Sequence, residues 1–348
     1  MQPFLASAPT PVALPIPEAP VLVAPDSFKG TFRATEVAAA IGRGLERAGL
    51  QPPDLCPVAD GGEGTMEVLL TALGGETAAT RVHDPLGRHI TAGWGLLEDG
   101  RTAIVETAAA SGLGLVAEDE RDAWAAGTGG TGELICAAAD AGAAVVLVAV
   151  GGSATTDGGA GALEAIEEAG GLGGARIVVL CDVRTPFERA PAVFGPQKGA
   201  DPALVARLEA RLAEVAARLP RDPRGVPMTG AAGGLSGGLW AAHGAQLEPG
   251  APWILDALDF DARMRAARAV VTGEGRLDEQ TLEGKLVGEI GTRTRQAGVP
   301  LHAIVGSDGL DAFGKRVIDL QLVQEATDLD AIEAAGETLG RALADGTA

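Results

Sequence analysis

Tyrosine is absent from the 348 residues of this chain, and aromatic residues of all kinds make up only 3% of it. Hydrophobic residues still reach 46%, so a core can form, but it must be filled by alanine, valine, leucine and isoleucine. Single hydrophobic cores stop growing at roughly 250–300 residues, beyond which chains divide. We therefore expect two domains.

Cysteine is nearly absent as well, with Cys56, Cys136 and Cys181 as the three examples. Their number is odd and no two of them form a CxxC pair, which argues against a disulfide framework. The pattern indicates free, buried thiols in a reducing cytoplasm. The four histidines likewise show no metal-ligand spacing.

Long apolar runs and a positive net charge are also missing. Because no run of about 18 uncharged apolar residues occurs, we expect no membrane-spanning helix. Residues 1–20 are rich in proline and alanine and carry no basic residue, the first being Lys29; they lack the start of a signal peptide and are predicted to form a disordered leader. A net charge of −20 opposes binding to nucleic acid and anionic lipid. An anionic ligand would need backbone amides, a few cations and a metal ion around it.

Lysine occurs only four times, each time beside a glycine: Lys29-Gly30, Lys198-Gly199, Gly284-Lys285 and Gly314-Lys315. A compact ammonium next to a backbone that only glycine allows to approach closely is typical of anion sites. We interpret the pattern in this way. The alternative is four ordinary lysines in a chain with 51 glycines.

The order of apolar segments predicts an α/β fold. The chain opens with a strand at 21–24, a helix at 35–48 with Thr35 as its N-cap, a strand at 55–59 and a helix at 66–73, which indicates a parallel sheet covered by helices. A Pro-Leu-Gly turn within 83–88 then separates two stretches of β-type alternation, which predicts a hairpin. Further helices are expected at 132–141, 202–219 and 329–343. Two more are expected after glycine-rich loops, one following 151–159 and ending at 169 and one following 273–278 and ending at 296. Further strands are expected at 145–150, 177–181, 270–272 and 301–305.

A strand that ends in a glycine-rich polar loop before a helix recurs along the chain. Such loops gather at the carboxyl edge of open α/β sheets, where ligands bind and helix N-termini offer N–H groups to anions. We expect two α/β domains with the site in the cleft between them. One is doubly wound and mostly parallel (21–80 plus about 255–348), and the second is smaller with mixed β structure (about 81–254).

Two loops of the first domain carry candidate substrate and catalytic groups. In the loop 26–30, Ser27 and Lys29 are expected to contact an anionic substrate or phosphate, and the alternative is that Asp26 and Ser27 are ordinary turn formers. In the loop 60–65, Asp60 and Glu63 could hold Mg²⁺, or one of them could accept a hydroxyl proton, as phosphoryl transfer requires. The alternative is an acidic helix start.

Two further loops carry candidate phosphate and metal groups. In the loop 151–159, clustered glycines and hydroxyls suit a phosphate cradle and Asp157 suits a metal, with a tight turn for close packing as the alternative. In the loop 272–278, Glu274 and Asp278 suit a metal, and Arg276 could clamp a carboxylate or phosphate. An internal ion pair of Arg276 with either carboxylate is the competing interpretation.

Three motif matches fail on their context. The GxGxxG match at 127–132 follows a polar stretch instead of a strand, and the GxxxxGK match at 309–315 has Arg316 where a Walker loop needs Ser or Thr. The GxSxG match around Ser236 has no apolar strand before it, so a serine hydrolase is disfavoured but stays an alternative.

Seven strings, taken in order, resemble those of the type I glycerate kinases. They are DSFKG at 26–30, DGGEGT at 60–65, GELI at 132–135, GGSAT at 151–155, FGPQKG at 194–199, GAAGG at 230–234 and TGEGRLD at 272–278. The resemblance implies a cytoplasmic two-domain α/β kinase that moves the γ-phosphoryl group of ATP to D-glycerate with Mg²⁺, typically at the 2-hydroxyl. The chain departs from the family pattern at Thr156, where asparagine is usual, in a shorter stretch at 170–177, in an altered segment at 286–288 and in the extra leader.

We therefore predict a glycerate kinase that uses ATP and Mg²⁺ and gives 2-phosphoglycerate. The predicted site comprises catalytic Lys29, Asp60, Glu63 and Arg276; substrate-binding Asp26, Ser27, Lys198 and Lys285; phosphate-binding Gly151, Gly152, Ser153, Thr155 and Gly158; and metal-binding Asp157, Glu274 and Asp278. The alternatives are 3-phosphoglycerate as product, a hydrolase that uses Ser236, and a non-catalytic anion-binding paralogue. The partners expected are small molecules, without nucleic acid or membrane, and a homodimer is among the assemblies that the sequence allows.

Overall fold

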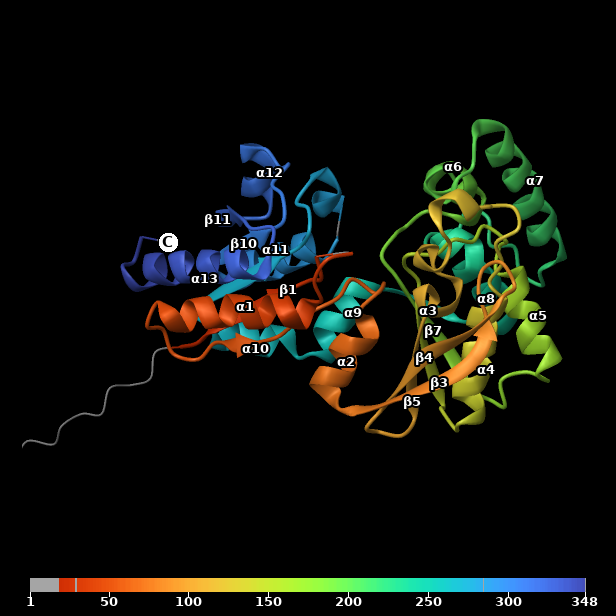
Figure 1. Ribbon diagram of the computed structural model, residues 1–348, viewed down its shortest axis with the longest axis horizontal. Helices are drawn as coiled ribbons and strands as arrows, with labels where there is room; N and C mark the ends of the chain where they lie inside the picture. Colours follow the sequence, from red (N-terminus) through yellow and green to blue (C-terminus); the bar gives the residue numbers. More distant parts are fainter. Residues whose placement is uncertain (1–18, 29, 284, 348) are drawn as a thin grey trace, which may run out of the picture.

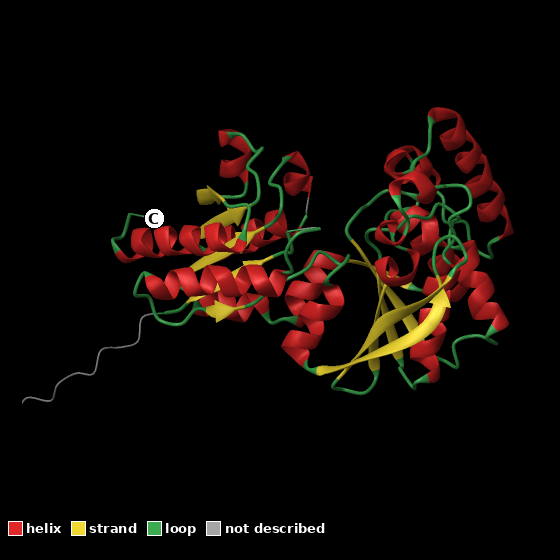
Figure 2. Cartoon of the chain, in the orientation of Figure 1, coloured by secondary structure: helices red, strands yellow, loops and turns green. Residues whose placement is uncertain are grey.

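The computed structural model describes residues 19–28, 30–283 and 285–347, arranged around two β-sheets (Figures 1 and 2). Nearly all of the predicted leader, and Lys29, lie outside these residues. No helix within the described part of the chain is long and apolar enough to cross a membrane. All three cysteines are free and buried, as the sequence predicts.

The first sheet has five strands, all parallel, in the order β11-β10-β9-β1-β2. The strands are β1 (Val21–Pro25), β2 (Asp54–Leu55), β9 (Ala269–Gly273), β10 (Leu301–Val305) and β11 (Leu320–Glu325). The chain runs outward from β1 to β2 in one direction and then from β9 to β11 in the other. The topological switch point therefore lies between β1 and β9, and the predicted doubly wound, parallel architecture is confirmed.

Successive side chains of these strands point to opposite faces of the sheet, and each face is covered by its own group of helices. Val21 and Val23 of β1 face α1 (Ala34–Arg47) and α13 (Leu329–Ala344), which lie side by side. Leu22 and Ala24 belong to the core on the opposite face, with α9 (Gly250–Ala257), α10 (Phe260–Ala266) and α11 (Leu286–Ala297). Successive strand residues point to opposite faces, so a fully apolar strand needs helices on both.

The second sheet has six strands in the order β3-β4-β5-β6-β7-β8. The strands are β3 (Gly75–His83), β4 (His89–Leu97), β5 (Thr102–Glu106), β6 (Val145–Ala149), β7 (Arg176–Cys181) and β8 (Gln246–Pro249). β3 and β4 form the predicted antiparallel hairpin, β5 is antiparallel to β4, and β5 to β8 are parallel. The mixed character is as expected, although this sheet has six strands against five in the parallel one.

The remaining helices complete the architecture. They are α2 (Thr65–Leu73), α3 (Thr107–Ser111), α4 (Gly129–Asp140), α5 (Ala160–Glu168), α6 (Ala190–Phe194), α7 (Pro202–Arg218), α8 (Leu235–His243) and α12 (Ala312–Val317). Short 3₁₀ turns occur at Leu113–Leu115, Glu118–Glu120, Phe187–Arg189, Pro196–Lys198, Ala231–Gly234 and Glu279–Glu283. α4, α5 and α8 cover one face of the mixed sheet.

Helices α2 and α9 lie between the two sheets (Figure 1). One hydrophobic cluster contains Leu69 of α2 and Ile254 of α9, together with Leu22 of the parallel sheet and Leu147 and Leu180 of the mixed sheet. The two sheets therefore share a continuous core. The domain limits predicted near residues 80 and 255 stay predictions, while the change from one sheet to the other falls between β2 and β3 and between β8 and β9.

Two local predictions need correction. Thr35 is not the N-cap of α1, because the helix begins at Ala34 with Arg33 as N-cap, where the Arg33 N–H donates to Glu36 Oε2 at 2.9 Å. The Thr35 hydroxyl instead donates to Glu67. The predicted strand at 55–59 is regular only in Asp54–Leu55.

Candidate functional site

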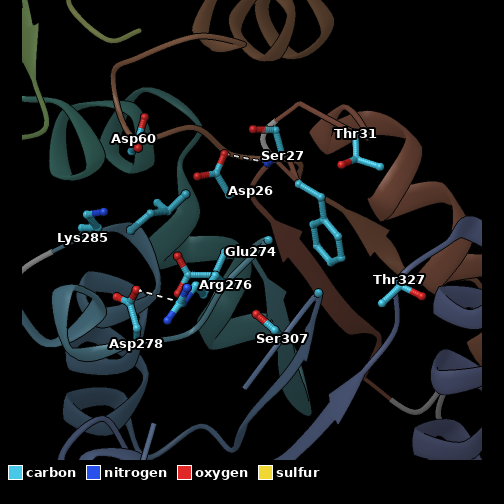
Figure 3. Close-up of a pocket in the computed structure, with 14 residues that line it drawn as sticks. Asp26, Ser27, Thr31, Asp60, Glu274, Arg276, Asp278, Lys285, Ser307 and Thr327 are labelled. Atoms are coloured by element: carbon cyan, nitrogen blue, oxygen red, sulfur yellow. Dashed lines mark hydrogen bonds and ion pairs between the residues drawn. The ribbon is translucent and has the colours of Figure 1, made fainter. Parts of the chain in front are cut away.

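A cavity of about 480 Å³ opens at the carboxyl edge of the parallel sheet (Figure 3). Loops after all five strands contribute to it, at the switch point where open α/β sheets bind ligands. Its polar lining residues are Asp26, Ser27 and Thr31 after β1, Asp60 after β2, Glu274, Arg276, Asp278 and Lys285 after β9, Ser307 after β10 and Thr327 after β11. Seven of these were predicted from the sequence, whereas Thr31, Ser307 and Thr327 were not.

Asp26 and Asp60 are buried carboxylates held by their own loops. The Ser27 N–H donates to Asp26 Oδ1 at 2.6 Å and the Gly62 N–H donates to Asp60 Oδ1 at 3.0 Å. The bond to Asp26 is the turn-forming contact that the sequence offered as an alternative for that loop, whereas the alternative for the loop 60–65 was an acidic helix start. The two bonds also fix the direction of each carboxylate, so the two interpretations of these residues are compatible.

The loop after β9 brings a cation and two carboxylates to the same cavity. Arg276 Nε lies 3.4 Å from Asp278 Oδ2, and Glu274 Oε1 accepts a bond of 2.7 Å from the Thr281 hydroxyl. The Arg276 side chain is 73% exposed, and exposed ion pairs contribute only about 0–1 kcal/mol. An anionic ligand can therefore compete for the guanidinium group.

The glycine-rich loop 151–159 lies at the carboxyl end of β6, in the mixed sheet. Lys198 approaches it from a neighbouring segment, with its side chain 2% exposed, and Nζ donates to Ser153 Oγ at 3.0 Å and to the Thr155 carbonyl at 2.5 Å. Burial lowers the pKa of the Lys198 ammonium to about 7, and the Asp157 carboxylate opposes that shift. A small cavity of about 90 Å³ touches Gly151, Gly152, Ser153 and Lys198. Lys198 therefore lies with the predicted phosphate cradle and not with Lys285.

Asp157 does not line the cavity that Glu274 and Asp278 line, so the three residues predicted to bind a metal do not share one cavity. The buried carboxylate of Asp157 accepts hydrogen bonds from the N–H and hydroxyl of Thr128 and from the N–H groups of Gly159 and Gly161. It organises the starts of α4 and α5. Across the described residues, no group of three or more histidine, cysteine, aspartate or glutamate side chains is arranged to hold a metal ion.

Thr155 and Gly158 also have packing roles. The Thr155 side chain is fully buried and its carbonyl accepts from Lys198. Gly158 has φ +69°, and a Cβ there would lie 2.9 Å from the Phe187 ring. The close-packing alternative therefore applies to these two positions, and Gly151, Gly152 and Ser153 stay as the predicted phosphate-binding residues of this loop.

The loop 60–64 connects the two groups of predicted site residues. A Cβ on Gly151 would lie 2.8 Å from the Gly62 Cα, and a Cβ on Gly250 would lie 2.1 Å from the Asp60 carbonyl oxygen. The loop is thus clamped between the mixed-sheet glycine loop and the start of α9. Asp60 lines the first cavity, and Glu63 lines a second one of about 370 Å³ that shares Ser27 and Thr31 with it.

Glu106 is a site residue that the sequence reasoning missed. It ends β5, and its Oε1 accepts bonds from the N–H groups of Gly64 at 3.0 Å and Met66 at 2.8 Å. Burial raises the pKa of its carboxyl to about 7; the two N–H bonds lower it, and the carboxylates of Glu63 and Glu67 raise it further. An acidic residue directly after the apolar run 103–105 was the available signal.

Three residues singled out from the sequence do not contribute to the cavities described above or lie outside the described residues. Lys29 lies outside the described residues. Ser236 is fully buried in α8, where its hydroxyl donates to the carbonyls of Met228 (2.7 Å) and Ala231 (3.2 Å), so the hydrolase alternative is wrong. Lys315, in α12, forms an ion pair with Asp308 and does not line any of the cavities described above.

The chain is similar to known proteins over nearly its whole length. The model of the glycerate kinase family matches residues 21–170 and 167–345. Glycerate kinase of Bacillus subtilis is 39% identical, with 93% of this chain and 96% of the relative covered, and glycerate 2-kinase of Escherichia coli K12 is 37% identical, with 82% and 85% covered. A crystal structure assigned to glycerate kinase 2 of Salmonella typhimurium LT2 superposes with a TM-score of 0.79 at 34% identity, covering 94% of this chain and 99% of the other. A doubly wound sheet with its cavity at the switch point and a match of this extent lead to one conclusion: the chain belongs to the glycerate kinase family.

Proposed function

We propose that the protein transfers the γ-phosphoryl group of ATP to the 2-hydroxyl of D-glycerate, giving 2-phosphoglycerate. The observation that carries the proposal is the cavity at the switch point, where loops from all five parallel strands bring four carboxylates, an arginine and a lysine together. Family membership supports the reaction class, and the relative from Escherichia coli is named a glycerate 2-kinase.

Mg²⁺ fits the chemistry of this cavity. Asp26, Asp60, Glu274 and Asp278 would repel two anionic substrates unless a cation lay among them, and carboxylate oxygens are the ligands that Mg²⁺ prefers. We assign Glu274 and Asp278 to hold it, since Mg²⁺ is usually bound through one or two carboxylates, with water and substrate phosphates as its other ligands. When bound, the ion would neutralise charge on the phosphates of the nucleotide.

The chain's own groups position and neutralise the substrates. Arg276 and Lys285 line the cavity and suit the carboxylate of D-glycerate or the migrating phosphoryl group. Asp60, oriented by the Gly62 N–H, is our candidate acceptor for the proton of the attacking hydroxyl, with Glu63 next to it. In a loose phosphoryl-transfer transition state such placement supplies most of the catalysis.

The loop 151–153 is our candidate for the phosphates of ATP. Its glycines expose backbone N–H groups, and Lys198 and the Ser153 hydroxyl already lie within 3.0 Å of each other. The clamp between Gly62 and Gly151 keeps this loop beside the one that carries Asp60 and Glu63. A donor bound at one loop and an acceptor bound at the other would therefore meet.

The test is an ADP-release assay with ATP, Mg²⁺ and D-glycerate. Rapid, glycerate-dependent ADP formation is the expected result and would exclude a non-catalytic paralogue; its absence would refute the proposal. Phosphorus NMR of the product would then distinguish 2-phosphoglycerate, which we expect, from 3-phosphoglycerate. Cytoplasmic location and the oligomeric state stay predictions.

A further inference from the structure

We propose that Glu106 is a positioning residue, which holds the loop carrying Asp60 and Glu63 in its productive place from the opposite sheet. The inference rests on the proposed kinase function, since it assigns that loop to the reaction. Glu106 itself lines the second cavity and is not placed against the reacting groups.

Glu106 reaches the loop from the carboxyl edge of the mixed sheet. It is in register with Ala149 of β6, two residues before the Gly151 loop, so both lie at the same edge. Its Oε1 accepts the N–H groups of Gly64 (3.0 Å) and Met66 (2.8 Å) at the start of α2. One oxygen therefore fixes the point at which the loop becomes a helix.

This contact replaces a cap that the local sequence does not supply. The N-cap of α2 is Gly64, with φ +93° and no side chain that could accept the first N–H groups. A helix start normally finds such an acceptor within its own sequence. Here the acceptor comes from 42 and 40 residues away, so the position of the loop depends on the mixed sheet.

The arrangement is more costly than an ordinary cap would be. Glu106 is buried beside the carboxylates of Glu63 and Glu67, and both repel its charge. A side-chain cap at position 64 is disfavoured by the backbone, because its φ of +93° lies in the left-handed region that favours glycine, whereas serine and aspartate caps adopt β-region angles. The Gly62–Gly151 and Gly61–Gly250 contacts allow the loop to pass between the sheets, and Glu106 then fixes its end.

The experiment compares Glu106→Ala and Glu106→Gln in steady-state assays with D-glycerate and ATP. We expect Glu106→Ala to lower kcat about 10- to 100-fold, with both KM values changed less than about threefold, because the acid–base loop is displaced and the substrate-binding residues are not. Glu106→Gln keeps an acceptor oxygen and should restore kcat to within about fivefold of the wild type.

Asp84→Ala is the matched control. Asp84 is another buried carboxylate that accepts two backbone N–H bonds, from Leu86 (2.8 Å) and Arg88 (2.9 Å), in the turn between β3 and β4. Its loss should lower the melting temperature and leave kcat unchanged. A folded Glu106→Ala protein with wild-type kcat, or an equal loss of kcat in Asp84→Ala, would overturn the positioning role.

Amide hydrogen exchange separates this inference from the proposed function. In Glu106→Ala the amides at 61–66 should exchange about five- to tenfold faster than in the wild type, whatever reaction the enzyme catalyses. If the wild type does not phosphorylate D-glycerate but this exchange increases, the proposed function fails and the anchoring of the loop stands. Unchanged exchange would refute the anchoring.

Discussion

At the residue scale, the lysines that share a glycine neighbour belong to three different environments. Lys198 is buried against the Ser153 hydroxyl, Lys285 lines the cavity of the parallel sheet, and Lys315 pairs with Asp308. The sequence pattern identified lysines that suit anions but could not separate these environments, because the separation depends on which sheet each loop follows.

We predict that two lysine substitutions affect different substrates. Lys198→Met should raise the KM for ATP about tenfold or more, because it removes the ammonium from the glycine loop, while the KM for D-glycerate changes little. Lys285→Met should raise the KM for D-glycerate instead. Steady-state kinetics with each substrate varied in turn gives the comparison, and Lys315→Met is the control, expected to match the wild type. The assignment fails if Lys198→Met and Lys285→Met raise the same KM.

His302 has a different consequence, for stability. It is fully buried in β10 and neither ring nitrogen has a hydrogen-bond partner among the described residues. Burial lowers its pKa to about 4, below the value of about 6.5 in an unfolded chain. The unfolded state therefore binds the proton more readily, so the stability is fully present above pH 6.5 and is lost as the pH falls toward 4.

We predict that this histidine alone removes about 2 kcal/mol of unfolding free energy between pH 8 and pH 5. His302→Leu replaces the unpartnered nitrogens with apolar atoms of similar volume and should abolish that part of the loss. Urea unfolding of both proteins at the two pH values measures it. Identical losses in the variant and the wild type would show that His302 is not responsible.

At the scale of elements, glycines decide how closely segments approach. Gly250 begins α9 with its Cα against the loop 60–64, and a Cβ there would lie 2.1 Å from the Asp60 carbonyl. Gly44 of α1 is equally close to α13, where a Cβ would lie 2.1 Å from the Glu333 carbonyl. The two contacts are matched in distance, and they differ in that only the first touches a loop of the candidate site.

We predict that Gly250→Ala lowers kcat about tenfold or more, because the backbone carrying Asp60 must move. Gly44→Ala should destabilise the protein by about 1–3 kcal/mol, despite the helix preference for alanine, and leave kcat unchanged. Kinetics combined with thermal unfolding of both variants distinguishes the effects. Equal kcat values for the two variants would contradict the role given to the Gly250 contact.

The elements themselves were largely predictable, and the long-range contacts were not. Periodicity located α7, α13, β7 and β10 to within about one residue. The prediction of the N-cap of α1 was wrong. Thr35 has a side chain typical of an N-cap, but Arg33 occupies that position and its N–H donates to Glu36. Asp157 resembled a metal ligand because its use by Thr128, 29 residues earlier, leaves no mark in the local sequence. The cap that Glu106 supplies to α2 was not predicted either, because its partners lie 42 and 40 residues away in the sequence.

At the scale of the whole molecule, the shared core joins the two sheets. Leu22, Leu69, Leu147 and Ile254 belong to one buried cluster that runs from the parallel sheet through α2 and α9 to the mixed sheet. Separating the sheets would expose this apolar surface to water, which costs about 25 cal/mol per Å². The sheets should therefore not open independently.

We predict a single cooperative unfolding transition for the whole chain. Calorimetric and van't Hoff enthalpies should agree, and Ile254→Ala, in the shared cluster, should lower the melting temperature without splitting the transition. Leu339→Ala, in the separate α1–α13 cluster, is the matched control because it also removes a buried side chain. It too should lower the melting temperature without splitting the transition. Two resolved transitions in the wild type would mean that the sheets unfold separately.

The position of β1 beside β9 also determines the order in which the molecule can be built. The Thr272 hydroxyl donates to the Ala24 carbonyl across 248 residues of chain, and the whole mixed sheet lies within that interval. During synthesis the strands β3 to β8 emerge together and can pair while β1 still has no neighbour on its β9 side. The edge of Val21–Pro25 that faces β9 therefore stays unpaired until residues 269–273 have been synthesised.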